Sequence, residues 1–319
     1  MKINYLTLEK DFINQIKKYQ KQYDKLFFIT QSPILNQNSI VDTIIQTGHH
    51  YICSDNEECK SLKEYEKIIK FLSSNYCNKN SVIISIGGGT VTDLCGFVSS
   101  SYMRGIAHIV VPTTLLGMVD AAIGGKTALN VGKIRNLIGS YKNPDSLIIY
   151  NQFLKTLSKN DIINGYAEII KYALIMDEKL FIKIENNIDE LLSNMNLDFM
   201  QSIITICIDH KLNIVNQDQY DQGIRNILNF GHTTGHALES YSNFKIPHGT
   251  AVFHGIRIAS YLSYKENNIT SKEYNRIIKL IEKMNLKKLG KMDYNAIMDL
   301  IDLDKKNISK KLNYILLKK

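Results

Sequence analysis

The chain has 319 residues, of which 44% are hydrophobic and 22% are charged. This length and composition suit two globular domains and leave no case for global disorder. Lysine and arginine number 39 against 31 acidic residues, a net charge of +8. Many lysines are dispersed through amphipathic segments, with the dense tail DKKNISKK as the exception, and no basic stretch is interleaved with aromatic residues in the manner of a nucleic-acid module. That distribution disfavours nucleic acid as a partner and favours small anions.

The five cysteines are odd in number and include no C-x-x-C pair. Reduced thiols are therefore expected in place of a disulfide framework or a thiolate zinc site. The opening MKINYLTLEKDF has no apolar signal core, and no apolar run approaches the roughly 18 residues needed to span a bilayer. We expect a cytoplasmic protein with no membrane partner.

Short apolar runs alternate with helical patterns in the first half of the chain. This alternation predicts an α/β domain over residues 1–155, with a mainly parallel sheet and crossover helices. The clearest intervening helix is SLKEYEKIIKFLSS, residues 61–74. The predicted strands are KLFFIT (25–30), HHYICS (49–54), SVIISI (81–86), AHIVV (107–111) and SLIIY (146–150).

Three glycines, Gly87 to Gly89, follow the third predicted strand and open a helix. Glycine at this place lets backbone N–H groups approach a phosphate, whose charge the helix N-terminus favours. Asp93 is placed either to contact a ligand hydroxyl or to interact with the helix dipole. Because the spacing is not G-x-G-x-x-G, a turn that only reverses the chain remains the alternative.

The segment VPTTLLGMVDAAIGGKTALN, residues 111–130, is apolar but carries Thr113, Thr114, Asp120 and Lys126. Polar groups buried in such a segment need partners. A ligand and a structural network are both open as the source of those partners.

After about residue 155 the pattern changes to long helical periodicities, which predict an all-α domain over residues 156–319. Strand-like character returns only in LNYILL, residues 312–317. The predicted helices are 161–175, 200–215, 235–241, 249–263 and 273–284.

One carboxylate and three histidines in this half suggest a metal site. Glu168 is flanked by apolar residues, and a buried carboxylate needs a cation, which is either Lys171 three residues on or a metal. His232 and His236 share a helix face, and His248 precedes another helix. One Glu with two or three His is a plausible zinc site, with packed or solvated histidines as the alternative.

The chain resembles the 3-dehydroquinate synthase family in five motifs that occur in fixed order over about residues 55–255. These motifs are IGGGTVTDLCGFVSSSYMRG, VPTTLLGMVDAAIGGKTALN, NLIG, GYAEIIKYA and LNFGHTTGHALE followed by HG. The resemblance implies a nucleotide-binding α/β domain that holds NAD, an all-α metal-binding domain and a homodimer. It also implies one Zn²⁺ or Co²⁺ held by Glu168, His232 and His248, with His236 on the substrate side.

The remaining site residues implied by the resemblance fall into two sets. Those facing the anionic substrate are Arg104, Lys126, Asn136, Lys171, Lys211, Arg225, Asn229 and either Lys305 or Lys306. Those facing NAD are Glu57, Lys60, Gly88, Gly89, Thr90, Asp93, Thr113, Thr114, Asp120, Lys126, Arg135, Phe153, Leu154, Lys155 and Thr156.

The implied activity converts 3-deoxy-D-arabino-heptulosonate 7-phosphate to 3-dehydroquinate and phosphate in the shikimate pathway. NAD transiently oxidises a ring hydroxyl, phosphate is eliminated, the ketone is reduced again, and the ring opens and recloses. The alternatives are another sugar phosphate cyclase, such as a 2-deoxy-scyllo-inosose synthase-like enzyme, a metal-dependent dehydrogenase of related architecture, and a non-catalytic NAD-binding relative.

Four features depart from the family pattern. Arg135 stands at a usual lysine, Ala121 and Ala122 replace paired serines, and ITQSP (29–33) lacks an acid and an asparagine. Thr250 replaces a usual glutamate, which is expected to loosen the orientation of the neighbouring histidine ligand. These departures are expected to affect NAD affinity more than the metal and phosphate sites.

Overall fold

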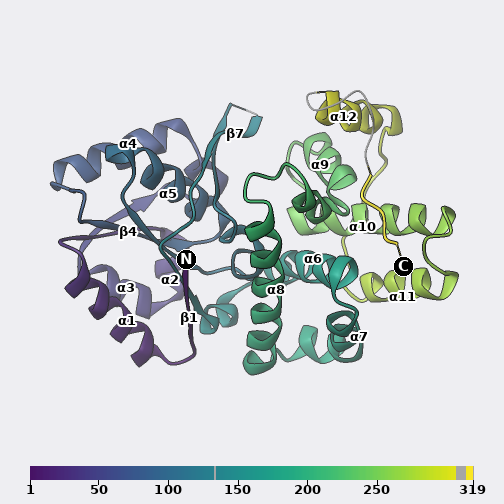
Figure 1. Cartoon of the computed structure of the whole chain (residues 1–319), viewed down its shortest axis with the longest axis horizontal. Helices are drawn as coiled ribbons and strands as arrows, with labels where there is room; N and C mark the ends of the chain where they lie inside the picture. The colour runs from purple at the N-terminus through teal and green to yellow at the C-terminus, as the bar shows by residue number, and fades with distance from the viewer. Residues whose placement is uncertain (133, 307–313, 319) are drawn as a thin grey trace. The chain divides into compact units, whose positions relative to one another are not determined.

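The computed structural model describes residues 1–132, 134–306 and 314–318, apart from the side chains of 303–306. The chain divides into two compact units, Met1–Ser158 and Lys159–Lys319. The first is α/β with a parallel sheet and the second is helical, so the predicted fold class is confirmed (Figure 1). None of the described helices is both long and apolar enough to cross a membrane.

The first unit is built on a six-stranded sheet in the order β1-β8-β5-β4-β2-β3, with every neighbouring pair parallel. Every residue of β2 and β4 is buried, as expected where helices cover both faces of a parallel sheet. The strands are β1 (Lys2–Leu6), β2 (Leu26–Gln31), β3 (His49–Cys53), β4 (Val82–Gly87), β5 (Ala107–Pro112) and β8 (Ser146–Tyr150). All five predicted strands are therefore present.

The sequence analysis missed edge strand β1 and a separate antiparallel hairpin, β6 (Lys126–Val131) with β7 (Ile134–Tyr141). Neither β1 nor β7 has a continuous apolar run, and all their residues are exposed or partly buried. Their pairing partners are also what hold them in place. β1 pairs with β8, which lies far along the chain, with Lys2 opposite Ser146, and no local sequence pattern reveals such a partner.

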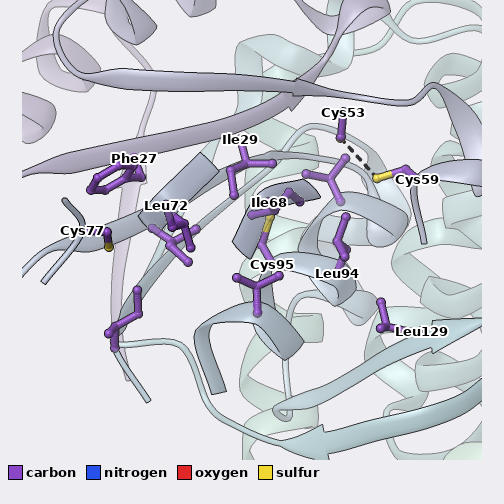
Figure 2. Packing of buried hydrophobic residues seen from close by; sticks show 14 residues of the cluster. Phe27, Ile29, Cys53, Cys59, Ile68, Leu72, Cys77, Leu94, Cys95 and Leu129 are labelled. Atoms are coloured by element: carbon purple, nitrogen blue, oxygen red, sulfur yellow. Dashed lines mark hydrogen bonds between the residues drawn. The ribbon is translucent and has the colours of Figure 1, made fainter. Parts of the chain in front are cut away.

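Helices cover both faces of the sheet, with α1 and α3 on one face and α4 and α5 on the other (Figure 1). Ser61 caps α4 by accepting a hydrogen bond from the Glu64 backbone N–H at 3.3 Å. Figure 2 shows the core beneath α4 and α5, where the Cys59 and Cys53 sulfurs lie 3.2 Å apart as free thiols. The helices are α1 (Glu9–Gln22), α2 (Ser32–Gln37), α3 (Ser39–Ile45), α4 (Leu62–Ser74) and α5 (Gly89–Ser101).

The second unit contains α6 (Lys159–Met176), α7 (Glu178–Ser193), α8 (Leu197–Gln217), α9 (His232–Tyr241), α10 (His248–Lys265), α11 (Ser271–Glu282) and α12 (Tyr294–Lys306). All five predicted helices are present, and α7 and α12 are additional. The described residues 314–317 of the strand-like LNYILL form no strand, and the rest of that segment lies outside the described residues.

Glycines let the helices of the second unit approach closely. A Cβ on Gly235 of α9 would lie 3.3 Å from the Val252 Cα of α10. A Cβ on Gly249 of α10 would lie 2.6 Å from the Asn164 Cα of α6. The Gly249 contact leaves no room for a side chain, and the Gly235 contact would be tight for one. The starts of α9 and α10 and the middle of α6 are consequently held against one another.

Acid sensitivity should follow from His108, which is 2% exposed in β5 and whose Nε2 lies 2.8 Å from the Ser85 hydroxyl. Burial, with a contribution from Lys142, lowers the pKa of His108 from 6.5 to about 3. The unfolded chain therefore binds more protons between those values, and stability is lost as the pH falls through that window. The loss is at most about 1.4 kcal/mol per pH unit.

We expect His108→Gln to flatten the dependence of the urea unfolding midpoint on pH between about pH 7 and pH 5. The matched control is His50→Gln on β3, at an exposed position, which should keep the wild-type dependence. An unchanged pH dependence in His108→Gln would contradict the assignment.

Candidate functional site

Three side chains of the helical unit converge on one point. Glu168 comes from the middle of α6, whereas His232 and His248 are the first residues of α9 and α10. Glu168 Oε1 lies 3.5 Å from the Nε2 atom of each histidine, and the three ligand atoms lie within 4.8 Å of one another. A tetrahedral ion with bonds of about 2.0–2.1 Å holds its ligand atoms about 3.4 Å apart. The spacing therefore fits a metal ion of this kind.

The Glu168 carboxylate gives an independent reason for a cation. Its side chain is fully buried, Oε2 pairs with the Lys171 ammonium, and Oε1 accepts no hydrogen bond. Burial acts to raise the pKa of this carboxyl, but the charges of Lys171, His232 and His248 hold it well below its usual range. A buried anionic oxygen without a donor is costly, and a bound cation removes that cost.

Hydrogen bonds at the far nitrogens orient both imidazoles. His232 Nδ1 lies 3.2 Å from the Phe230 carbonyl, and His248 Nδ1 lies 3.3 Å from Glu239 Oε2. An N–H at Nδ1 leaves the lone pair on Nε2, which faces Glu168, as in metal-binding histidines. The carboxylate that orients His248 thus comes from Glu239 on α9, whatever residue stands at position 250.

The two histidines differ in basicity. Burial lowers the pKa of His232 to about 3 in spite of Glu168. Burial also opposes a charge on His248, but the nearby Glu168 and Glu239 carboxylates outweigh it and raise the pKa to about 10. The Glu168 carboxylate and the two imidazoles form a set of ligands whose negative charge one added cation would balance.

His236 lies near this cluster without joining it. Its ring centroid is 5.3 Å from that of His232, as expected for helix positions four apart, but the side chain is exposed. It does not belong to the group of three possible ligands found among the described residues. Its role on the substrate side stays a prediction.

Three predicted substrate-binding cations are buried in the same unit. Lys171, Lys211 and Arg225 are 2%, 6% and 3% exposed, and they come from α6, α8 and the short 3₁₀ helix η5 (Ile224–Asn229). These three elements pack against one another. Arg225 Nη1 donates to the Gln219 carbonyl at 2.7 Å, and Asn229 is exposed at the end of η5. Lys171 already pairs with Glu168, and cations of this kind can donate charge-assisted hydrogen bonds to an anionic ligand.

In the first unit, the glycine turn presents backbone N–H groups. Gly88 is the N-cap of α5, and no side chain caps this helix. A Cβ on Gly88 would lie 3.2 Å from Thr114 Cγ2, and one on Gly89 would lie 3.4 Å from Ala121 Cβ. No side chain therefore accepts the first N–H groups of α5, and such groups suit an anionic ligand.

A second polar cluster brings together predicted NAD-binding residues from distant segments. Lys60 pairs with Asp93, and Asn130 Nδ2 donates to Glu57 Oε1 at 2.9 Å. Arg135 Nε lies 3.7 Å from the same Glu57 oxygen. Sequence reasoning missed Asn130, which only the β6–β7 hairpin places beside Glu57.

The loop that carries Glu57 is held by hydrogen bonds from the Gln31 side chain. Gln31, in the segment where the family acid is absent, is 8% exposed and donates through Nε2 to the Ser54 carbonyl at 2.7 Å. The same group lies 3.2 Å from the Asn56 carbonyl. This departure from the family pattern thus serves loop structure.

Several predicted site residues lie elsewhere in the first unit. Arg104 is exposed and has a positive φ of 62°. It lies in the turn before β5, whereas the glycine turn follows β4, so the two turns are at opposite ends of these parallel strands. Phe153 and Leu154 are buried in the core, so their side chains serve packing, and Lys155 and Thr156 follow on the surface.

The remaining predicted residues lie near the strand ends and the hairpin. Lys126 lines a small cavity together with Asp93 and His108, and the Asn136 N–H donates to Asn130 Oδ1 at 3.0 Å. Of the others, Thr90 lies on α5, Thr113 lies in the turn after β5, and Asp120 lies in the helical turn Gly117–Ala121. The side chains of Lys305 and Lys306 lie outside the described part of the chain.

The fold and the site define a protein of two units. In the α/β unit a glycine turn without a side-chain cap follows β4, and in the helical unit Glu168, His232 and His248 form a metal-type cluster, a group of side chains that could hold a metal ion. Residues 50–164 match the family model for the 3-dehydroquinate synthase N-terminal region, and residues 165–307 match that for the C-terminal region. The chain belongs to the 3-dehydroquinate synthase family.

Individual relatives agree with this assignment. The chain is 39% identical over 303 residues to a 3-dehydroquinate synthase of Clostridium tetani, covering 93% of this chain and 80% of the relative. It is 40% identical over 258 residues to one of Pseudoalteromonas translucida, covering 81% and 72%.

Solved structures share the fold. A 2-epi-5-epi-valiolone synthase from Streptomyces hygroscopicus, with NAD⁺ and Zn²⁺ bound, matches with a TM-score of 0.88 at 21% identity, over 99% of this chain and 89% of that one. A 2-deoxy-scyllo-inosose synthase complexed with carbaglucose-6-phosphate, NAD⁺ and Co²⁺ matches with a TM-score of 0.87 at 23% identity, over 99% and 88%.

Glu239→Gln should weaken metal binding, because the amide can no longer accept the His248 N–H as a charged oxygen does. We expect zinc affinity, measured by competition with a chelating dye, to fall about 10- to 100-fold while the fold is kept. Glu282→Gln, at an exposed site on α11, is the matched control. Equal affinity in the two variants would show that Glu239 does not position the ligand.

Proposed function

We propose that this protein is a 3-dehydroquinate synthase, which converts 3-deoxy-D-arabino-heptulosonate 7-phosphate to 3-dehydroquinate and phosphate with NAD and one Zn²⁺ or Co²⁺. The observation that carries the proposal is the convergence of Glu168, His232 and His248, in a chain that matches the family over both units. The domain functions follow, with NAD binding in residues 1–155 and metal and substrate binding in residues 156–319.

The metal would be held by Glu168 Oε1 and the two Nε2 atoms. A bound ion supplies Lewis acidity toward a hydroxyl or ketone oxygen of the substrate. The Lys171 ammonium keeps the other carboxylate oxygen paired, so the carboxyl stays ionised. Glu239 and the Phe230 carbonyl fix the imidazoles with their lone pairs directed at the ion.

NAD would be held by the first unit. The N–H groups at Gly88, Gly89 and Thr90 suit the pyrophosphate, since a helix N-terminus favours negative charge. The polar cluster of Glu57, Lys60 and Asp93 offers both donors and acceptors to nucleotide hydroxyls. Bound NAD supplies a transient hydride acceptor, and it is regenerated within the same turnover.

The substrate carries a carboxylate and a phosphate, which match the excess of basic side chains. Lys171, Lys211 and Arg225 are the buried candidates for charge-assisted hydrogen bonds to these groups. The further candidates are Arg104, Lys126, Asn136, Asn229, His236 and either Lys305 or Lys306. A homodimer and a cytoplasmic location, in keeping with five free thiols, complete the proposal.

A second candidate is a sugar phosphate cyclase that acts on a different phosphorylated sugar. Two such enzymes share this fold with TM-scores of 0.88 and 0.87. The burial of both Lys211 and Arg225 favours a substrate with a carboxylate beside the phosphate. A panel of acidic and neutral sugar phosphates separates the two functions.

The purified protein should release inorganic phosphate from the heptulosonate phosphate when NAD and Zn²⁺ are supplied. NADH should not accumulate, because the hydride returns to the product. Phosphate release is followed by a coupled colour assay and NADH by absorbance. Net NADH formation would instead support a dehydrogenase, and no release from the metal-loaded protein would reject the synthase.

The variants His248→Ala and His236→Ala should separate metal binding from turnover. His248→Ala removes a ligand atom, so metal content and activity should be lost together. His236→Ala leaves the three ligands in place, so bound metal should stay near one per chain while turnover falls. Elemental analysis with phosphate-release rates checks both, and a metal-free His236→Ala would show that His236 is a ligand.

A further inference from the structure

A cavity of about 390 Å³ lies in the helical unit, and neither His232 nor His248 lines it. Its walls are the turn between α9 and α10, the start of α6, and the segment 285–292 between α11 and α12. Small-molecule pockets typically enclose about 300–1,000 Å³. Neither Glu168 nor any of the buried cations Lys171, Lys211 and Arg225 lines it.

The cavity is strongly basic. Four lysines line it (Lys245, Lys287, Lys288 and Lys291), and no acidic residue does. Over the described part of the chain, none of their ammonium groups takes part in a hydrogen bond or an ion pair. All four lysines are exposed, so their charges are accessible to an anion that enters the cavity.

The nearest acid in the same segment is already engaged. Asp293 follows the last lining residue, and its Oδ1 accepts the backbone N–H groups of Asn295 and Ala296 at 2.9 and 3.3 Å. This carboxylate therefore caps the start of α12. Its own N–H donates to the Tyr241 hydroxyl at 3.1 Å, which ties the basic segment to the end of α9.

The cavity also has an apolar surface. Ile163, Ile246, Leu289 and Met292 line it, and the last three pack against the core cluster that contains Leu238 and Ile297. A small inorganic anion would leave this surface in contact with water. An uncharged apolar compound would leave the lysines without a counter-charge.

We propose that this cavity binds an amphipathic organic anion, with a carboxylate, sulfonate or phosphate group against the lysines and an apolar body against Ile163, Ile246 and Met292. The walls continue the elements that carry the metal ligands. Pro247 directly precedes His248, Tyr241 ends the helix that begins with His232, and Ile163 lies five residues before Glu168 on α6. The site does not depend on the proposed activity.

The test uses the metal-loaded protein with NAD in excess, so that nucleotide and metal sites are occupied. Two fluorescent probes share an apolar body. 8-Anilinonaphthalene-1-sulfonate is anionic, and N-phenyl-1-naphthylamine is uncharged. We expect the anionic probe to bind one per chain and about tenfold or more tightly than the uncharged one.

Lys245→Gln/Lys288→Gln should weaken binding of the anionic probe about tenfold or more and leave the uncharged probe unaffected. Lys272→Gln/Lys279→Gln on α11, which removes the same charge from exposed positions outside the cavity, should change neither affinity. Thermal melting by circular dichroism verifies that all variants are folded. Equal affinities for the two probes, equal effects of the two double variants, or no binding of the anionic probe would each overturn the proposal.

Discussion

The buried carboxylate of Glu168 is the group around which the helical unit is organised. One of its oxygens pairs with Lys171 from the next turn of α6, and the other faces two imidazoles without a hydrogen-bond donor. A carboxylate in this position is stable only beside positive charge. The Lys171 ammonium supplies part of that charge, and the same geometry offers three ligand atoms to a metal ion.

Close helix contacts make this geometry possible. His232 and His248 each occupy the first position of a helix, so small shifts of either helix would move an imidazole away from Glu168. Gly235 and Gly249 remove the side chains that would hold α10 apart from α9 and α6. Glu239, one helical turn after His236, then fixes the ring of His248. Packing and ligand orientation are thus two results of the same glycine-rich sequence.

In the α/β unit, the corresponding feature is the start of α5, where no side chain caps the backbone N–H groups. Gly88 ends the turn without a side-chain cap, and Thr114 and Ala121 fill the space that larger residues would need. The polar cluster of Glu57, Lys60, Asp93 and Asn130 is assembled from three segments of the chain. Gln31 holds the first of these segments in place, so a position without the family acid still contributes to the cluster.

The sequence by itself determined the buried strands, the amphipathic helices and the family, because apolar periodicity and long motifs are local properties. It also identified Glu168, His232 and His248 as one candidate group, through the resemblance alone. Only the tertiary structure decided that Glu239 orients His248 and that Asn130 joins Glu57. Strand β1 and the basic cavity beside α9 and α10 also depend on partners far away in the chain. Distances between residues so separated are set by packing, which no short stretch of sequence encodes.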